Sequence, residues 1–224
     1  MLRLLLLLIL ALPLNATEQF TGSFDLHATL SFKNGNSSRD TINYYFTETK
    51  TAIYIHTPSN QPDMKMIFDF VDSTITSLFE MNGKKGGYIL PMDEKHWPGL
   101  PESKSNTGTL TQQESLYTGE TKVIDGLECK QTKVEDDNYE VTLWLYEGYE
   151  LSMLQVLSYQ SVGKGKSKKE LEMFEKFGIN SLPIEMELIS KTGKADVIIK
   201  LVNFKENVPD DIFSTEGHNL SKVD

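Results

Sequence analysis

Cys129 is the only cysteine in this sequence of 224 residues, and its thiol is the first side chain to consider as a nucleophile. Nucleophilic catalysis by a thiol needs a neighbouring histidine and a lowered pKa. The residue pattern instead alternates Cys129 with Leu127 toward the inside of a strand, while Glu128 and Lys130 face water. We therefore expect Cys129 to be a buried, chemically inert core residue that forms no internal disulfide.

The other residues that could carry chemistry do not form recognised motifs. The acidic run over 135–137 is typical of a solvated turn and lacks the spacing of a calcium-binding loop. The sequence contains no G-x-S-x-G, no H-E-x-x-H, no phosphate-binding glycine loop and no dinucleotide fingerprint. We therefore predict a protein that is not an enzyme, with no catalytic residues, no metal site and no cofactor. The histidines, which show no metal-ligand spacing such as His-x-x-x-His, are His27, His56, His96 and His218.

The composition and the first residues predict one exported domain. The formal net charge of −10 argues against nucleic acid and anionic lipid surfaces as partners, because both require a basic surface. Arg3, an apolar run over 4–12 and a small residue at Ala16 have the pattern of a secretory signal peptide cleaved after Ala16. That run is shorter than the roughly 20 residues of a membrane-spanning helix. We therefore predict a signal peptide over 1–16 and a single domain over 17–224, located in the periplasm or outside the cell and not spanning a membrane.

Period-two alternation dominates the domain and predicts its fold class. Even positions from Phe20 to Phe32 are almost all apolar and odd positions are polar, which predicts a long strand with one buried face. Further short alternating runs are joined by turn residues, so we expect an antiparallel meander. The pattern stops over 91–113, which we predict to be a mobile loop. The fold class is α+β: a strongly curved antiparallel β-sheet, an incomplete barrel, with one or two short helices over its concave face.

A helix over 168–177 is predicted to cover an apolar concavity. Ser167 and Glu170 form a capping box, and an apolar stripe follows that must lie on an apolar surface. Two late strands carry apolar residues on both faces and are the predicted partner surface. The stretch 151–157 fits either a strand or a helix, and we favour a helix. The predicted ligand-binding residues are Trp144, Phe174, Phe177, Ile198 and Val202.

Sparse positions in the domain form one pattern, which consists of Thr118, Gly119, Lys122, Ile124, Gly126, Cys129 and Trp144. These positions resemble a family of uncharacterised exported bacterial proteins. The family pattern runs roughly T-G-x-x-K-x-I-x-G-x-x-C, followed by a strand that bears a tryptophan. The start of the domain, F-x-G-x-F, and the segment 208–213 are also similar to that family, while Leu127 stands where an aromatic residue is more usual. No activity or catalytic residue is assigned to the family, so none is carried over.

The strand-rich layout of this family is similar to that of periplasmic lipoprotein carriers. In those carriers a curved, incomplete barrel holds acyl chains under a helical lid. The resemblance implies a non-enzymatic envelope protein that binds an apolar ligand, such as a lipid or a lipoprotein acyl chain. The alternative is a protein-interaction module of the cell envelope, which has a filled core and binds another envelope protein without a small ligand.

Overall fold

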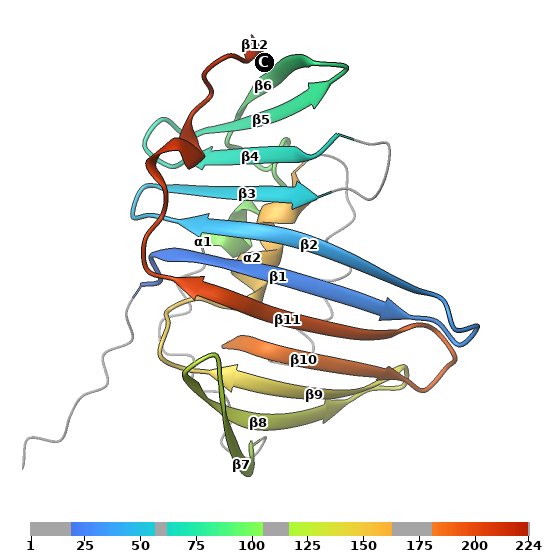
Figure 1. Ribbon diagram of the computed structural model, residues 1–224. Coiled ribbons are helices and arrows are strands. Elements are labelled where there is room, and N and C mark those ends of the chain that lie inside the picture. Colours follow the sequence, from blue (N-terminus) through green and yellow to red (C-terminus); the bar gives the residue numbers. More distant parts are fainter. Residues whose placement is uncertain (1–18, 57–61, 105–116, 163–180, 224) are drawn as a thin grey trace, which may run out of the picture.

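The computed structural model describes residues 19–56, 62–104, 117–162 and 181–223 (Figure 1). In these residues twelve strands form one curled sheet, with two short α-helices behind it (Figure 1). The predicted signal peptide lies outside the described residues. The strands are β1 (Gly22–Ser31), β2 (Ser37–Phe46), β3 (Lys50–His56), β4 (Met64–Asp69), β5 (Thr74–Met81), β6 (Lys84–Pro91), β7 (Tyr117–Ile124), β8 (Leu127–Glu135), β9 (Tyr139–Tyr146), β10 (Leu182–Ser190), β11 (Asp196–Lys205) and β12 (Asn219–Lys222). The helices are α1 (Leu100–Lys104) and α2 (Met153–Ser158), with 3-10 helices η2 (Tyr159–Ser161) and η3 (Asp210–Phe213).

The order of the strands places β1 in the middle of the sheet. Strands β1 to β6 follow one another from the middle to one edge, and β7 to β11 return from the opposite edge until β11 pairs with β1. Neighbouring strands are antiparallel except for β12, which runs parallel to β6. The predicted fold class is therefore confirmed: a strongly curved antiparallel sheet that forms an incomplete barrel, with short helices over its concave face.

The helix α2 is capped at its start and held to the sheet by a side chain of β2. The backbone N–H of Gln155 donates to Oγ of Ser152 at 3.2 Å, and the N–H of Ser152 donates to Oε1 of Gln155 at 2.8 Å. This capping box satisfies two N–H groups that would otherwise lack a partner. The Tyr44 hydroxyl donates to the carbonyl oxygen of Val156 at 3.1 Å. The helix favoured over 151–157 is confirmed.

The segment between β6 and β7 begins with ordered structure. It contains α1, whose first turn carries Pro101 at a position where a missing backbone N–H costs little. Trp97, just before this helix, is fully buried. Residues 105–116 lie outside the described part of the chain, so the mobility expected over 91–113 remains a prediction.

A β-bulge in β11 changes which face its last residues occupy. The register between β1 and β11 shifts between the pairs Asp25–Val202 and Ser23–Lys205, and Asn203 between them has a φ of 60°. Uninterrupted period-two alternation would put Phe204 on the same face as Val202. The bulge inserts one residue and reverses the alternation, so the ring of Phe204 lies 5.3 Å from the buried ring of Phe24 instead.

The β7–β8 hairpin folds over the convex face of the sheet, in front of β9 and β10 in Figure 1. Its turn is Asp125-Gly126, and both residues have positive φ, 54° and 83°, as expected for a tight two-residue hairpin turn. Oδ2 of Asp125 accepts a hydrogen bond from the backbone N–H of Asn203 at 3.1 Å. Cys129, in β8 of this hairpin, is fully buried, which confirms its predicted burial, and burial raises its pKa to about 11.

The C-terminal segment crosses the convex face from β11 to the far edge of the sheet (Figure 1). Lys65 of β4 donates to the carbonyl oxygen of Ile212 at 2.8 Å, and Ile212 packs on a small buried cluster formed by Ala52, Ile67 and Leu78. Among the described residues, no helix has both the length and the apolar character needed to cross a membrane.

Candidate functional site

The structure places Trp144, Ile198 and Val202 on the convex face of the sheet. Leu201 is fully buried on the concave face, and successive side chains of a strand alternate between faces, so Val202 points to the other side. Trp144 alternates in the same way with the fully buried Leu143. These three residues therefore lie on the face opposite to α2, and their ligand role remains a prediction. Alternation separates two faces of a strand but does not say which one the helix covers.

Charged side chains divide these convex-face residues from one another. Nζ of Lys122 lies 4.2 Å from the centre of the Trp144 ring and 3.2 Å from Oε1 of Glu185. Nζ of Lys200 lies 3.3 Å from Oε2 of the same glutamate. A row of charges thus separates Trp144 from the apolar residues of β11. The other two predicted ligand residues, Phe174 and Phe177, and their helix over 168–177 lie outside the described residues, and their ligand role remains a prediction.

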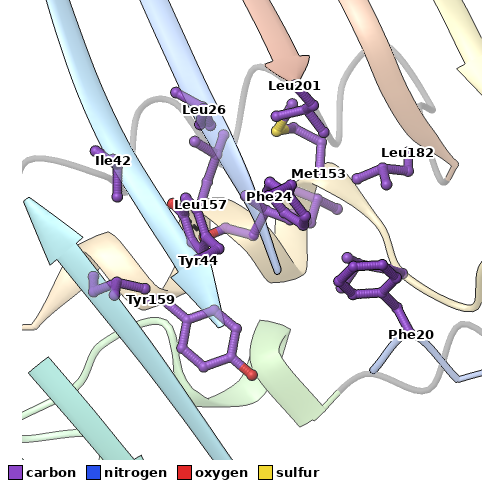
Figure 2. Close-up of a cluster of buried hydrophobic side chains, with 14 of the residues drawn as sticks. Phe20, Phe24, Leu26, Ile42, Tyr44, Met153, Leu157, Tyr159, Leu182 and Leu201 are labelled. Atoms are coloured by element: carbon purple, nitrogen blue, oxygen red, sulfur yellow. Dashed lines mark hydrogen bonds between the residues drawn. The ribbon is translucent and has the colours of Figure 1, made fainter. Parts of the chain in front are cut away.

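The centre of the concave face is filled by side chains. Figure 2 shows the buried cluster in which Met153 and Leu157 of α2 meet Phe24 and Tyr44 of the sheet. The rings of Phe24 and Tyr44 stack with centroids 5.2 Å apart. The Tyr44 hydroxyl also accepts a hydrogen bond from Nε2 of Gln160 at 2.6 Å. This part of the concave face is protein core.

A pocket of about 370 Å³ opens at the end of the concave face where β1 begins, and we call it the α2 pocket. Its apolar floor contains Phe20, Phe46, Phe70 and Tyr159. Phe20 lies just before β1, Phe46 ends β2, Phe70 follows β4, and Tyr159 belongs to η2. The sequence contained no motif for this site, because its residues are brought together only by the curl of the sheet and by α2. The other lining residues are Gln19, Thr47, Glu48, Thr51, Ser103, Glu150, Leu151 and Gln155.

The polar groups of the α2 pocket are neutral or negative. The Tyr159 hydroxyl accepts a hydrogen bond from Oγ1 of Thr51 at 3.3 Å, and burial raises the pKa of Tyr159 to about 12, so this phenol stays protonated. Glu48 and Glu150 are the charged residues of the lining, which holds no lysine, arginine or histidine among the described residues. The pocket therefore offers aromatic surface, hydroxyl and amide groups, and two carboxylates.

A second pocket of about 490 Å³ lies on the other side of Phe20, and we call it the β11 pocket. Its apolar surface comes from Phe20, Tyr149 and Phe204, and Phe204 reaches it only because of the bulge at Asn203. The remaining lining residues are Gln19, Thr21, Lys205 and Glu206. In the parts of the chain that the structure describes, no group of three or more histidine, cysteine or acidic residues is arranged to hold a metal ion.

No protein-family model matches the sequence, and no curated protein sequence matches it significantly. Among solved structures, the chain is similar to PNGF-II, with 13% identity and a TM-score of 0.40 over 91% of this chain and 32% of that one. It is similar to the LolA superfamily protein NE2245 from Nitrosomonas europaea, with 10% identity and a TM-score of 0.34 over 88% and 91% of the two chains. It is also similar to the MucA/MucB complex of Pseudomonas aeruginosa, with 11% identity and a TM-score of 0.38 over 87% of this chain and 56% of that one. The chain thus spans about a third of the length of PNGF-II.

Proposed function

We propose that this protein is a non-enzymatic binding protein of the cell envelope that holds a single apolar chain, such as the acyl chain of a lipid or a lipoprotein, in the α2 pocket. The observation that carries the proposal is the aromatic floor of this pocket, which is open at one end of a concave face whose centre is filled by side chains. Its volume of about 370 Å³ falls in the range of small-molecule sites.

The aromatic and aliphatic residues of the lining support an apolar chain. Three phenylalanine rings, Leu151 and the ring of Tyr159 offer apolar contact, and burial of each methylene group contributes about 0.8 kcal/mol. The side-chain amide of Gln19, an exposed residue of the lining, can hydrogen-bond the polar end of the ligand. The one thiol of the described chain is a poor nucleophile, because burial raises the pKa of Cys129 to about 11.

The two tryptophans allow the position of a bound chain to be tested. The Trp97 ring lies 5.4 Å from the ring of Tyr159 and 6.5 Å from that of Phe70, both of which line the α2 pocket. Trp144 lies on the convex face. Bromine atoms on an acyl chain quench tryptophan fluorescence at short range. A neutral monoacylglycerol brominated in mid-chain, bound in the α2 pocket, therefore quenches Trp97 more than Trp144.

The experiment uses the variants Trp144→Phe and Trp97→Phe, each with one tryptophan left and each first shown to be folded by circular dichroism. Saturable quenching in Trp144→Phe, with little quenching in Trp97→Phe, is the expected result. Extraction of the purified protein with organic solvent and mass spectrometry should also yield a co-purified lipid. Preferential quenching of Trp144 would move the site to the convex face. No quenching in either folded, lipid-free variant would overturn the proposal in favour of the protein-interaction module.

A further inference from the structure

We propose that Phe20 is a partition between the α2 pocket and the β11 pocket, and that its ring sets the length of apolar chain that the protein accepts. This inference rests on the proposed function. It adds a residue that determines which ligand fits, and it treats the β11 pocket as space that the ligand cannot reach while the Phe20 ring is in place.

The ring of Phe20 has one pocket on each side. Phe20 and Gln19 are the lining residues that the two pockets share. Toward the α2 pocket, the Phe20 ring meets Phe46 with centroids 5.6 Å apart and an interplanar angle of 75°. Toward the β11 pocket, it meets Tyr149 at 4.8 Å and 64°. These edge contacts hold the ring between the pockets, and only 7% of Phe20 is exposed.

The topology of the sheet explains why this residue divides the space. Strand β1 lies between β2 and β11, so a residue just before β1 separates the end of β2 from the end of β11. The α2 pocket contains residues at the end of β2, and the β11 pocket contains residues at the end of β11. Figure 2 shows the Phe20 ring at this end of the cluster, beside the point where the backbone enters the sheet.

Gly22 fixes the path of the backbone that carries Phe20. Gly22 has a φ of +137°, in the region that residues with a side chain rarely adopt, and it pairs with Phe46 of β2. A Cβ atom at this position would lie 2.2 Å from the carbonyl oxygen of Lys205 in β11. The glycine thus lets the chain pass close to β11 and places residues 19–21 across this end of the sheet.

In the wild-type protein, an apolar ligand chain that enters the α2 pocket ends against the ring of Phe20. Each added methylene group then strengthens binding about fourfold until the chain reaches Phe20, and further methylene groups add little. Replacing Phe20 with alanine joins the two pockets and more than doubles the space available to one chain. The chain length at which affinity stops rising should therefore increase in the Phe20→Ala variant.

The test measures the affinity of a homologous series of neutral monoacylglycerols of increasing chain length, by displacement of the brominated probe from Trp97. The wild-type protein is compared with the variants Phe20→Ala and Phe204→Ala. Phe204 also packs on Phe20, with centroids 6.2 Å apart, but it lines only the β11 pocket, so its removal leaves the partition in place. We expect the plateau of affinity to move to longer chains in Phe20→Ala and to stay unchanged in Phe204→Ala.

If Phe20→Ala does not fold, Phe20→Leu keeps most of the buried apolar surface while narrowing the partition, and it should move the plateau in the same direction. Saturable binding with the same plateau in the wild type and in the Phe20 variants would overturn the partition and leave the proposed function standing. Absence of binding to the folded wild type at every chain length would overturn both. An equal movement of the plateau in Phe204→Ala would show that the β11 pocket as a whole limits the length of the bound ligand. That result would also overturn the role of Phe20.

Discussion

The indole Nε1 of Trp97 donates a 2.7 Å hydrogen bond to the backbone carbonyl oxygen of Ser158. This bond joins the segment after β6 to the last residue of α2. A second bond, from the backbone N–H of Gly99 to Oγ of Ser161 at 2.8 Å, continues the same contact into η2. Because Trp97 is fully buried and its ring lies 4.7 Å from that of Phe68, it ties this segment, α2 and the sheet together beneath the α2 pocket.

Replacing Trp97 with alanine should destabilise the protein strongly. The change leaves a cavity in the core and removes the hydrogen bond to Ser158, so we expect the free energy of unfolding to fall by about 3–5 kcal/mol. The measurement is urea-induced unfolding followed by circular dichroism. Trp144→Ala is the matched control, because Trp144 is only half-buried and its ring contact with Lys122 is worth about 0.5–1 kcal/mol. Equal losses in the two variants would contradict a structural role for Trp97.

Gly22→Ala should destabilise the protein more than Gly35→Ala. Both glycines have positive φ, which costs a residue with a side chain about 1–2 kcal/mol. At Gly35 a new Cβ atom meets nothing within 4 Å, whereas at Gly22 it would lie 2.2 Å from the backbone oxygen of Lys205. We therefore expect a further loss of about 1–3 kcal/mol in Gly22→Ala, from crowding between β1 and β11. Urea unfolding measures both variants, and a loss at Gly22 no larger than that at Gly35 would refute the close approach.

Much of the fold could be predicted because local patterns decide it. Alternation over 20–32 predicted the long strand β1. The Asp125-Gly126 turn is likewise decided locally, since this dipeptide adopts the positive φ that a two-residue hairpin turn needs. The same alternation predicted the burial of Cys129. Each of these inferences depends on residues that are neighbours in sequence.

The candidate site could not be predicted because it depends on contacts between distant elements. Phe46 and Tyr159 are far apart in sequence, and only the curl of the sheet over α2 brings them into one pocket. The bulge at Asn203 has no simple sequence signal, yet it moves Phe204 to the other face. Alternation also assigned Trp144 to a second apolar face without indicating that charged partners and the β7–β8 hairpin occupy that side of the sheet.

The thiol of Cys129 should react slowly and with a strong dependence on pH. Burial raises its pKa to about 11, and only the thiolate reacts, so the thiol is almost fully protonated at neutral pH. If iodoacetamide labels Cys129 in the folded state, the rate of labelling should rise about tenfold for each pH unit up to about pH 10. In denaturant, labelling at neutral pH should be fast. Fast labelling of the native protein at pH 7 would contradict the inert-core assignment.

The same shift predicts the direction of a change in stability. The pKa of the thiol is higher in the folded state than its ordinary value of 9.0, so the folded state holds this proton over a pH range in which the unfolded state has lost it. The contribution of the protonated, buried thiol is therefore complete below pH 9 and is lost as the pH rises toward 11. A Cys129→Ala variant should show a smaller loss of stability over this range than the wild type.

The rim of the α2 pocket should discriminate between ligands by the charge of their polar end. Glu48 and Glu150 line it without a lysine, arginine or histidine among the described lining residues. At pH 7 an alkylamine is cationic and a fatty acid of the same chain length is anionic. We expect the amine to bind more tightly than the acid by about tenfold or more, with the corresponding alcohol in between. Displacement of the brominated probe from Trp97 measures all three.

The double variant Glu48→Gln with Glu150→Gln should bring the three affinities close together, chiefly by strengthening the binding of the fatty acid. The matched control is Glu187→Gln with Glu216→Gln, which changes the net charge equally but at exposed positions outside the lining of the pocket. Added salt should also reduce the preference in the wild type, because it screens charges at an open rim. If both double variants reduce the preference equally, it arises from the net charge of the protein. A wild type that binds the fatty acid as tightly as the amine would show that these two carboxylates do not face the polar end of the ligand.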